Sequence, residues 1–492
     1  MEKLPEHKRS HGIHWITAMF FIIADCAGGG IIALPTAAQN TNFYVGFFLC
    51  YLIAVVASVT AILLSKSWLI LLRNWSVYRE EFCRKPYAEI GYRAMGKRAK
   101  LAVSICLIIS QFGTCVTFFL LTSKNIHDFI ASLTTHSPDV CLVILAVGLV
   151  LWPICMLKSP ENFSWVIVGG MACTFIAITL IVIGAGVDYH VCSSQWKEPK
   201  FKAWNFFSGL GTFLFTYAGH SAFPTVQHDM KLGLISASIS SLDFRKPADF
   251  TKSIVCAFAL IALSYAPVLI LGHLAYGSSL RDSIINNIQT NWIQQSANLL
   301  IAFHCMLTLI LMFSPINQEA EEYFKIPQEF GPKRIILRTG MLFITILMAE
   351  TVPSFGPVLD LFGSSTMAIN FLIFPCLFYL FLTASERKAL DTQQPLQHLT
   401  FKEMISLTNR RTLIFCFTLI LFAFLGGGVA TVSAFRDITH TRFEVPCFVK
   451  PFVVHEYPIF KSTNCCGPFQ NVTVTGDDPS TFCNAPDLKF YG

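Results

Sequence analysis

Eleven long apolar runs follow one another along this chain, and they constrain its fold more than any other feature. A helix that crosses the hydrocarbon core of a bilayer needs about 20 predominantly apolar residues. The runs cover residues 14–38, 43–65, 101–125, 140–157, 163–186, 205–228, 253–276, 293–316, 335–352, 358–383 and 411–434. The sequence therefore predicts an all-α integral membrane protein, with eleven transmembrane helices in one domain over residues 14–434.

Composition excludes the other broad classes of protein. Hydrophobic residues make up 53% of the 492 residues and charged residues 13%, whereas ordinary domains have about 45–50% and 25%. So few charged side chains cannot cover a soluble fold of this size, and disorder requires low hydrophobicity. The sequence has no catalytic or metal-ligand motif. We therefore expect neither an enzyme nor a cofactor nor a bound metal, and a net charge of +6 that reflects membrane topology rather than a nucleic-acid partner.

Lysine and arginine gather on one side of the predicted helices. Nine of the 36 lie between Lys66 and Lys100, while the loops at 39–42, 127–139 and 353–357 have none. Cytoplasmic loops carry the excess of positive charge, so residues 1–13 are predicted to be cytosolic. An odd number of spans then places residues 435–492 outside the cell or in a lumen. Both the plasma membrane and a lysosomal or vesicular membrane fit this topology.

The predicted outer tail is rich in cysteine. Residues 435–492 contain Cys447, Cys465, Cys466 and Cys483. A glycosylation sequon begins at Asn471, which suits a surface segment of a non-cytosolic compartment. Four cysteines in a short polar segment predict one or two disulfides, with three full pairings open. Cys141 and Cys192, at the outer ends of the fourth and fifth runs, form a further candidate pair. A protein partner of the tail is left open.

Two of the apolar runs are interrupted by glycine and proline at matching positions. In the first run, three consecutive glycines at 28–30 precede Pro35, and in the sixth run Gly219 precedes Pro224 by the same five residues. Glycine costs a helix interior about 1 kcal/mol relative to alanine, and proline removes a backbone donor. Unwound backbone at membrane depth is tolerated only where it is buried in protein or lines a cavity.

The two interrupted runs begin two predicted halves of five helices each, residues 14–186 and 205–383. Paired interruptions of this kind indicate an inverted-repeat transporter with a central substrate site. The free N–H groups at the start of a half-helix can hold a carboxylate without a charged side chain, which suits a small zwitterion. The predicted substrate-binding residues are Ala27, Gly28, Gly29, Gly30, Ile31, Gln111, Phe215, Tyr217, Ala218 and Gly219. Tyr217 is either an aromatic lid or a packed core residue, and Gln111 either faces the cavity or joins two helices.

Asp25 is the clearest ionisable residue inside a predicted span, one helical turn before the glycines. Ionisable residues at membrane depth are functional candidates by default. Burial of an isolated carboxylate favours its protonated form, so Asp25 is a candidate proton carrier; a permanent cation partner and a structural acid are the alternatives. His220, inside the second interruption, is the next candidate for ion coupling. The coupling ion is expected to be H⁺, with Na⁺ as the alternative, and His304 is expected to be a satisfied interior histidine.

These segments also resemble a known family. The stretches AGGGIIALPTA, SQFGTCVTFFLLTSKN and FTYAGHSAFPTVQHDM are similar to the first, third and sixth helices of the amino acid/auxin permease family. AYGSSLRDSIINN and ETVPSFGPVLDLFGSSTM are further matches. The family includes proton-coupled and vesicular inhibitory amino acid transporters. The resemblance covers roughly residues 12–434 and implies the leucine-transporter fold, eleven spans, and symport of small neutral amino acids, often with protons.

The chain departs from the family's pattern in two places. About fourteen extra residues, near 231–244, lie between Met230 and the segment beginning at Pro247. In the family that segment directly follows the sixth helix. The cysteine-rich tail is also unlike the short C-terminus typical of the family.

Three classes of function are compatible with these features. The leading hypothesis is a secondary-active, proton-coupled transporter of small neutral amino acids working by alternating access. Sodium coupling or exchange is its nearest alternative. An amino-acid-sensing receptor of transporter fold would bind tightly without flux. A channel is disfavoured because the sequence shows no pore helix with a repeated filter sequence.

Overall fold

The structure, a computed structural model, describes residues 13–81, 83–134, 138–156, 164–193, 201–230, 247–327, 329–352 and 354–440, and in the tail residues 447, 449, 465–467, 471–474, 478 and 483. Its α-helices are α1 (Trp15–Cys26), α2 (Leu34–Asn40), α3 (Phe43–Asn74), α4 (Val77–Glu80), α5 (Pro86–Met95), α6 (Lys97–Leu133), α7 (Val140–Cys155), α8 (Ser164–Cys192), α9 (Ala203–Thr216), α10 (Phe223–Asp229), α11 (Pro247–Tyr276), α12 (Asn291–Tyr323), α13 (Pro332–Thr351), α14 (Phe355–Phe362), α15 (Phe374–Thr392), α16 (Phe401–Leu407), α17 (Arg410–Phe422) and α18 (Gly428–His440). Shorter 3₁₀ turns are η1 (Ile31–Ala33), η2 (Gly277–Ser279) and η3 (Ile284–Asn287), and π-helical turns are η4 (Gly363–Met367), η5 (Ile369–Ile373) and η6 (Ala423–Gly427). Residues 1–12 and the insertion at 231–244 lie outside the described residues.

The helices confirm an all-α, multi-pass membrane protein. Seven helical segments in the described ranges are long and apolar enough to cross a bilayer, or eight if the bent pair α1 and η1–α2 is one span. The remaining predicted runs contain α7, which has 16 residues, the pair α9 and α10, and α13. The count of eleven spans stays a prediction.

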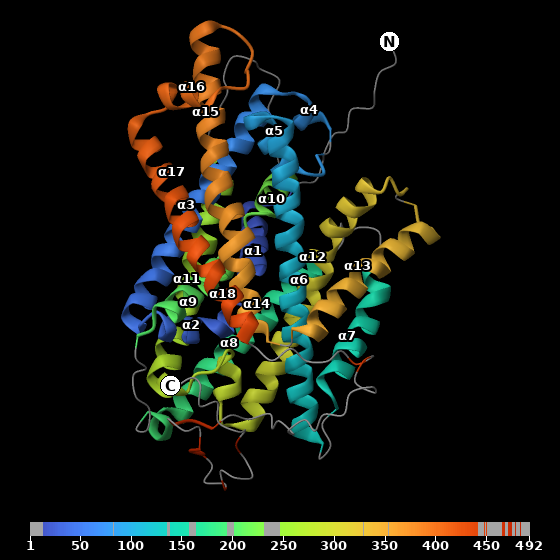
Figure 1. Cartoon of the computed structure of the whole chain (residues 1–492), viewed down its shortest axis with the longest axis vertical. Coiled ribbons are helices and arrows are strands. Elements are labelled where there is room, and N and C mark those ends of the chain that lie inside the picture. The colour runs from blue at the N-terminus through green and yellow to red at the C-terminus, as the bar shows by residue number, and fades with distance from the viewer. Residues whose placement is uncertain are drawn as a thin grey trace.

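Two long helices pack against each other in the bundle (Figure 1). α6 has 37 residues and packs along α12, which has 33. α12 also packs against α8, and α1 packs against α11. One buried apolar cluster contains side chains from all five of these helices. The broken helices therefore lie within protein, where their backbone is shielded from lipid.

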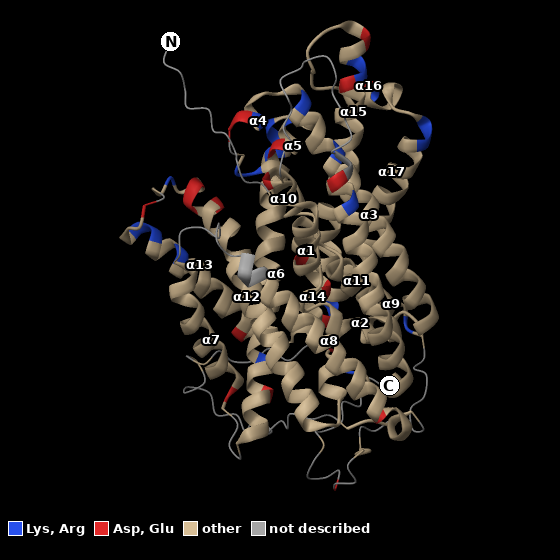
Figure 2. Ribbon diagram, turned by 180° about the vertical axis from the view of Figure 1, so that it is seen from behind, with Lys and Arg blue, Asp and Glu red and all other residues tan. Residues whose placement is uncertain are grey.

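Lysine and arginine residues are unevenly distributed along the long axis of the molecule. Figure 2 shows lysine and arginine gathered at the end that carries α4, α5 and α16. There Lys100 lies 2.5 Å from Glu89, whose pKa is lowered by Lys100 and by the hydroxyl of Tyr78, against the opposing effect of its partial burial. A concentration of positive charge at one end is the pattern that the cytoplasmic side of a membrane protein shows.

Three disulfides involve the tail, and two of them attach it to the opposite end of the bundle. Cys141 pairs with Cys447, Cys192 with Cys466, and Cys465 with Cys483. All six predicted cysteines are thus paired, but the predicted Cys141–Cys192 bond is wrong. Each of these two helix ends instead lies within bonding distance of its own tail cysteine, with Cα–Cα separations of 5.6 and 5.4 Å, in the range a disulfide requires.

The tail makes a further contact beside the first disulfide. The backbone N–H of Cys447 donates to a carboxylate oxygen of Glu350, near the end of α13, at 3.2 Å. Asn471 is exposed, as a glycosylation acceptor must be. The tail therefore connects the ends of α7, α8 and α13.

The pairing predicts the products of a non-reducing peptide digest. Peptides containing Cys141 should be linked to Cys447, and those containing Cys192 to the Cys465–Cys466 segment. Cys141→Ser should lower the free energy of unfolding by about 2–5 kcal/mol, the typical cost of losing a native disulfide. Cys256→Ser, at a free cysteine of α11, is the matched control. A linked Cys141–Cys192 peptide would contradict the structure.

Candidate functional site

The first apolar span is broken where the sequence places three glycines. α1 ends at Cys26, residues 27–30 are not helical, and the chain resumes as η1 and α2 after a bend of 51°. The N–H of Gly28 turns back to the carbonyl of Cys26 at 3.1 Å. Within the described chain, the N–H groups of Gly29 and Gly30 donate to no backbone or side-chain acceptor. The break thus provides two free donors next to the start of a half-helix.

The second break lies at the matching place in the sixth apolar run. α9 ends at Thr216 and α10 begins at Phe223, with Pro224 in its first turn. The N–H of Gly219 reaches the Tyr217 carbonyl at 3.2 Å. Among the residues that the structure covers, the N–H groups of His220 and Ser221 have no acceptor. Both predicted interruptions of regular hydrogen bonding are confirmed.

The two breaks touch each other through glycine. A Cβ atom on Gly30 would lie 2.6 Å from Oγ1 and 3.1 Å from Cα of Thr216. A Cβ atom on Gly219 would lie 2.6 Å from Sγ of Cys26 and 2.7 Å from a carboxylate oxygen of Asp25. Separations below 3.0 Å are not tolerated without movement. Because these two positions are glycine, the backbone of each broken helix can contact side chains of the other.

A pocket lies between the breaks, with about 540 Å³ of space free of protein atoms, part of it open to solvent. Besides the breaks it contacts α6, α12 and the π-helical turns η4 and η5. Its lining residues are Asp25, Cys26, Gly28, Gly29, Gly30, Ser110, Gln111, Thr114, Phe118, Phe215, Thr216, Ala218, His220, Ser221, Met312, Met367, Asn370 and Phe371.

Four polar side chains that line the pocket each leave one buried atom without a hydrogen-bond partner in the described part of the chain. These atoms are Oδ2 of Asp25, Oε1 of Gln111, Nδ1 of His220 and Oδ1 of Asn370. Such atoms cost free energy unless a ligand or water satisfies them. His220 holds its other nitrogen, Nε2, 3.1 Å from the carbonyl of Ala57. A carbonyl only accepts, so Nε2 carries the proton and Nδ1 of the neutral ring is an acceptor.

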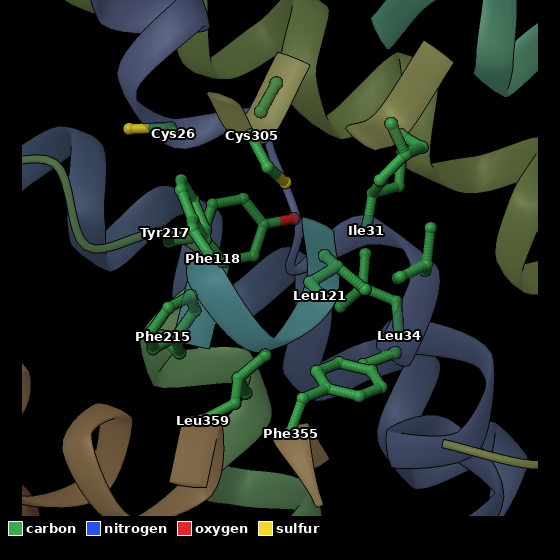
Figure 3. Close-up of a cluster of buried hydrophobic side chains, with 14 of the residues drawn as sticks. Cys26, Ile31, Leu34, Phe118, Leu121, Phe215, Tyr217, Cys305, Phe355 and Leu359 are labelled. Carbon is green, nitrogen blue, oxygen red and sulfur yellow. The ribbon is translucent and has the colours of Figure 1, made fainter. Parts of the chain in front are cut away.

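Eight of the predicted substrate- and ion-site residues line this pocket, and the other four do not. Tyr217 is fully buried and its hydroxyl lies 3.2 Å from Sγ of Cys50, so it is a core residue and not a lid. Ile31 belongs to the buried apolar cluster that includes Leu34 and Leu121 (Figure 3). Ala27 is buried outside the lining, and Gly219 contacts Asp25 behind it. The orientation of the Tyr217 ring is set by its contacts with residues of α3 and α11. The sequence around Tyr217 does not specify these contacts.

The sequence reasoning missed several lining residues. Thr114 and Phe118 follow Gln111 at spacings of three and seven, which places them on the same face of α6 and would have identified them. Met312, Met367 and Phe371 come from distant segments with no local signal. His304 is, as predicted, a satisfied interior histidine: its Nδ1 lies 3.0 Å from the carbonyl of Gly170 and 2.9 Å from Oγ1 of Thr174.

A profile described as transmembrane amino acid transporter protein matches residues 11–430. The chain belongs to this family. Its relatives are named transporters, so this is a non-enzymatic family.

Three relatives from Arabidopsis thaliana illustrate how distant the similarity is. Amino acid transporter AVT1D is 26% identical, over 72% of this chain and 61% of its own length. Amino acid transporter AVT1E is 23% identical, over 72% of this chain and 64% of its own length. Lysine histidine transporter-like 1 is 23% identical, over 78% of this chain and 83% of its own length. The match thus covers less than two thirds of the length of the first two relatives.

The fold is similar to a solved transporter structure. The structure titled inward facing conformation of Mhp1, a protein of leucine-transporter fold, superposes with a TM-score of 0.50 at 11% identity, over 93% of this chain and all of that one. This similarity concerns the fold alone, and it agrees with the family's predicted leucine-transporter architecture.

The contact between the breaks predicts the effect of a single methyl group. Gly30→Ala should force Thr216 away and lower the free energy of unfolding by about 1–3 kcal/mol, as overpacking typically does. The measurement is thermal unfolding of the purified protein. Gly340→Ala is the control, because nothing lies within 4 Å of a Cβ atom there. Equal stability of the two variants would show that the breaks do not abut.

Proposed function

We propose that this protein is a secondary-active transporter that carries small neutral amino acids together with protons by alternating access. The observation that carries the proposal is the pair of adjoining breaks, with the free N–H groups of Gly29 and Gly30 on the same pocket as the Asp25 carboxylate, which has no ion-pair partner among the described residues. The N–H groups bind the substrate carboxylate at the start of a half-helix. The Asp25 carboxylate interacts with the ammonium group or the coupled proton. Both ends of a zwitterion then have a partner.

Asp25 is the proposed coupling residue, and His220 assists it. Asp25 forms no ion pair with any described residue, and the pocket lining contains no lysine or arginine. An unpaired carboxylate at this depth is stabilised by taking up a proton. Protonation and substrate binding therefore occur at one place, which is what symport requires. Sodium coupling or exchange is the alternative that the experiment below distinguishes.

We also propose the membrane topology that accompanies this function. The protein has eleven spans: five in each of two inverted repeats, residues 14–186 and 205–383, and one extra helix after them. The N-terminus is cytosolic and the tail lies outside or in a lumen. Disulfides in the tail support this orientation, because they persist in oxidising compartments. The positive charge at the α4–α5 end supports it independently. Asn471 is then available for glycosylation, in the plasma membrane or in a lysosomal or vesicular membrane.

Uptake into liposomes containing the purified protein tests the function. An inward proton gradient should drive accumulation of a labelled neutral amino acid, and an equal sodium gradient should not. Asp25→Asn should reduce proton-driven accumulation to the level seen without a gradient and remove the pH dependence of uptake, while exchange of bound substrate persists. The matched control is Asp249→Asn, whose carboxylate lies near Lys252 at the bundle surface.

Two results would contradict the proposal. Unchanged pH dependence in Asp25→Asn would remove this residue from the coupling mechanism. Binding of amino acids without any flux under either gradient would favour the sensor instead.

A further inference from the structure

Two carboxamide side chains line the pocket from elements that are far apart in the sequence. Gln111 lies on α6 and Asn370 on η5. Asn370 is 3% exposed and donates through Nδ2 to Oγ of Ser110, at 3.0 Å. Gln111, the next residue after Ser110, donates through Nε2 to Oγ of Ser221, at 3.0 Å. Each amide is therefore held in place through its nitrogen.

The oxygen of each amide is left without a donor. Oε1 of Gln111 and Oδ1 of Asn370 are both buried, and neither has a partner among the described residues. The orientation of Asn370 is fixed further by its contact of 3.5 Å with the carbonyl of Cys106, because a carbonyl accepts only from the amide nitrogen. A buried acceptor without a donor costs free energy. A ligand that supplies two donors recovers this free energy.

The charges around the pocket limit which side chain supplies the donors. A second carboxylate would meet Asp25 and no lysine or arginine in the lining. A second cation would have no further acid there, since Asp25 is the single carboxylate among the lining residues and already serves the substrate ammonium or the coupled proton. An uncharged side chain is thus favoured. The NH₂ of a primary carboxamide carries two N–H donors, which equals the number of unpaired amide oxygens.

Resting on the transport function proposed above, we propose that Gln111 and Asn370 determine specificity, selecting amino acids with a carboxamide side chain over apolar ones of similar length. Met312, Met367 and Phe371 line the same pocket and contact the methylene groups of that side chain. A thioether or an alkyl group in the same place leaves both amide oxygens unpaired, whereas the carboxamide pairs them.

Uptake in proteoliposomes measures this selection directly. The specificity constants of glutamine, methionine and glutamate are compared under one gradient. The transporter should favour glutamine over methionine by about tenfold or more, the factor expected for an unpaired buried acceptor, and should exclude glutamate. Gln111→Met and Asn370→Leu should each reduce the ratio of glutamine to methionine toward one. This ratio does not depend on how much of the variant folds.

A matched control and two opposing outcomes make the test decisive. Gln318→Met removes an amide on α12 that also donates to a serine oxygen, Oγ of Ser314 at 3.1 Å, but does not line the pocket; its ratio should equal that of the unaltered protein. Transport of methionine as fast as glutamine, or an unchanged ratio in both pocket variants, would overturn the assignment of specificity. Absence of uptake of any amino acid by the folded protein would instead refute the transport function.

Discussion

Backbone hydrogen bonding is the constraint on which this structure depends. In hydrocarbon, each unpaired N–H or C=O group costs several kcal/mol, so membrane spans keep regular helical bonding from end to end. This chain departs from that rule at residues 27–30 and 217–222. Both departures are enclosed by other helices, and both face one pocket. The free energy lost at the breaks is recovered only if something in the pocket satisfies the exposed groups.

The surrounding fold provides the conditions for these breaks. α6 and α12 pack together, line the pocket beside the breaks and help to shield the unwound backbone from lipid. Gly30 and Gly219 permit contacts that any side chain would prevent. The pocket therefore combines loosened backbone with walls of packed helices, an arrangement that suits a small polar ligand. At the far end, disulfides to Cys141 and Cys192 attach the tail to α7 and α8.

Local sequence patterns predicted the breaks and the helical class, while long-range packing decided the rest. Glycine and proline act on their own turn of helix, so residues 28–30, Pro35 and Pro224 were sufficient to locate both interruptions. The position of Tyr217 depends instead on Cys50, which lies 167 residues away. Asn370 and Met367 reach the pocket only because η4 and η5 pack against α6. The disulfide pairing depends on where the tail runs in three dimensions, and the spacing of cysteines in the sequence does not determine this.

The most direct test of the account is amide hydrogen exchange, measured by mass spectrometry on peptides that cover the two breaks. Without substrate, the amides of Gly29, Gly30, His220 and Ser221 should exchange much faster than those of the flanking helices α1 and α9, because they have no acceptor among the described residues. A transported amino acid should slow the exchange of Gly29 and Gly30 by occupying their N–H groups. Protection equal to that of the flanking helices in the absence of substrate, or exchange that no amino acid changes, would contradict the central claim.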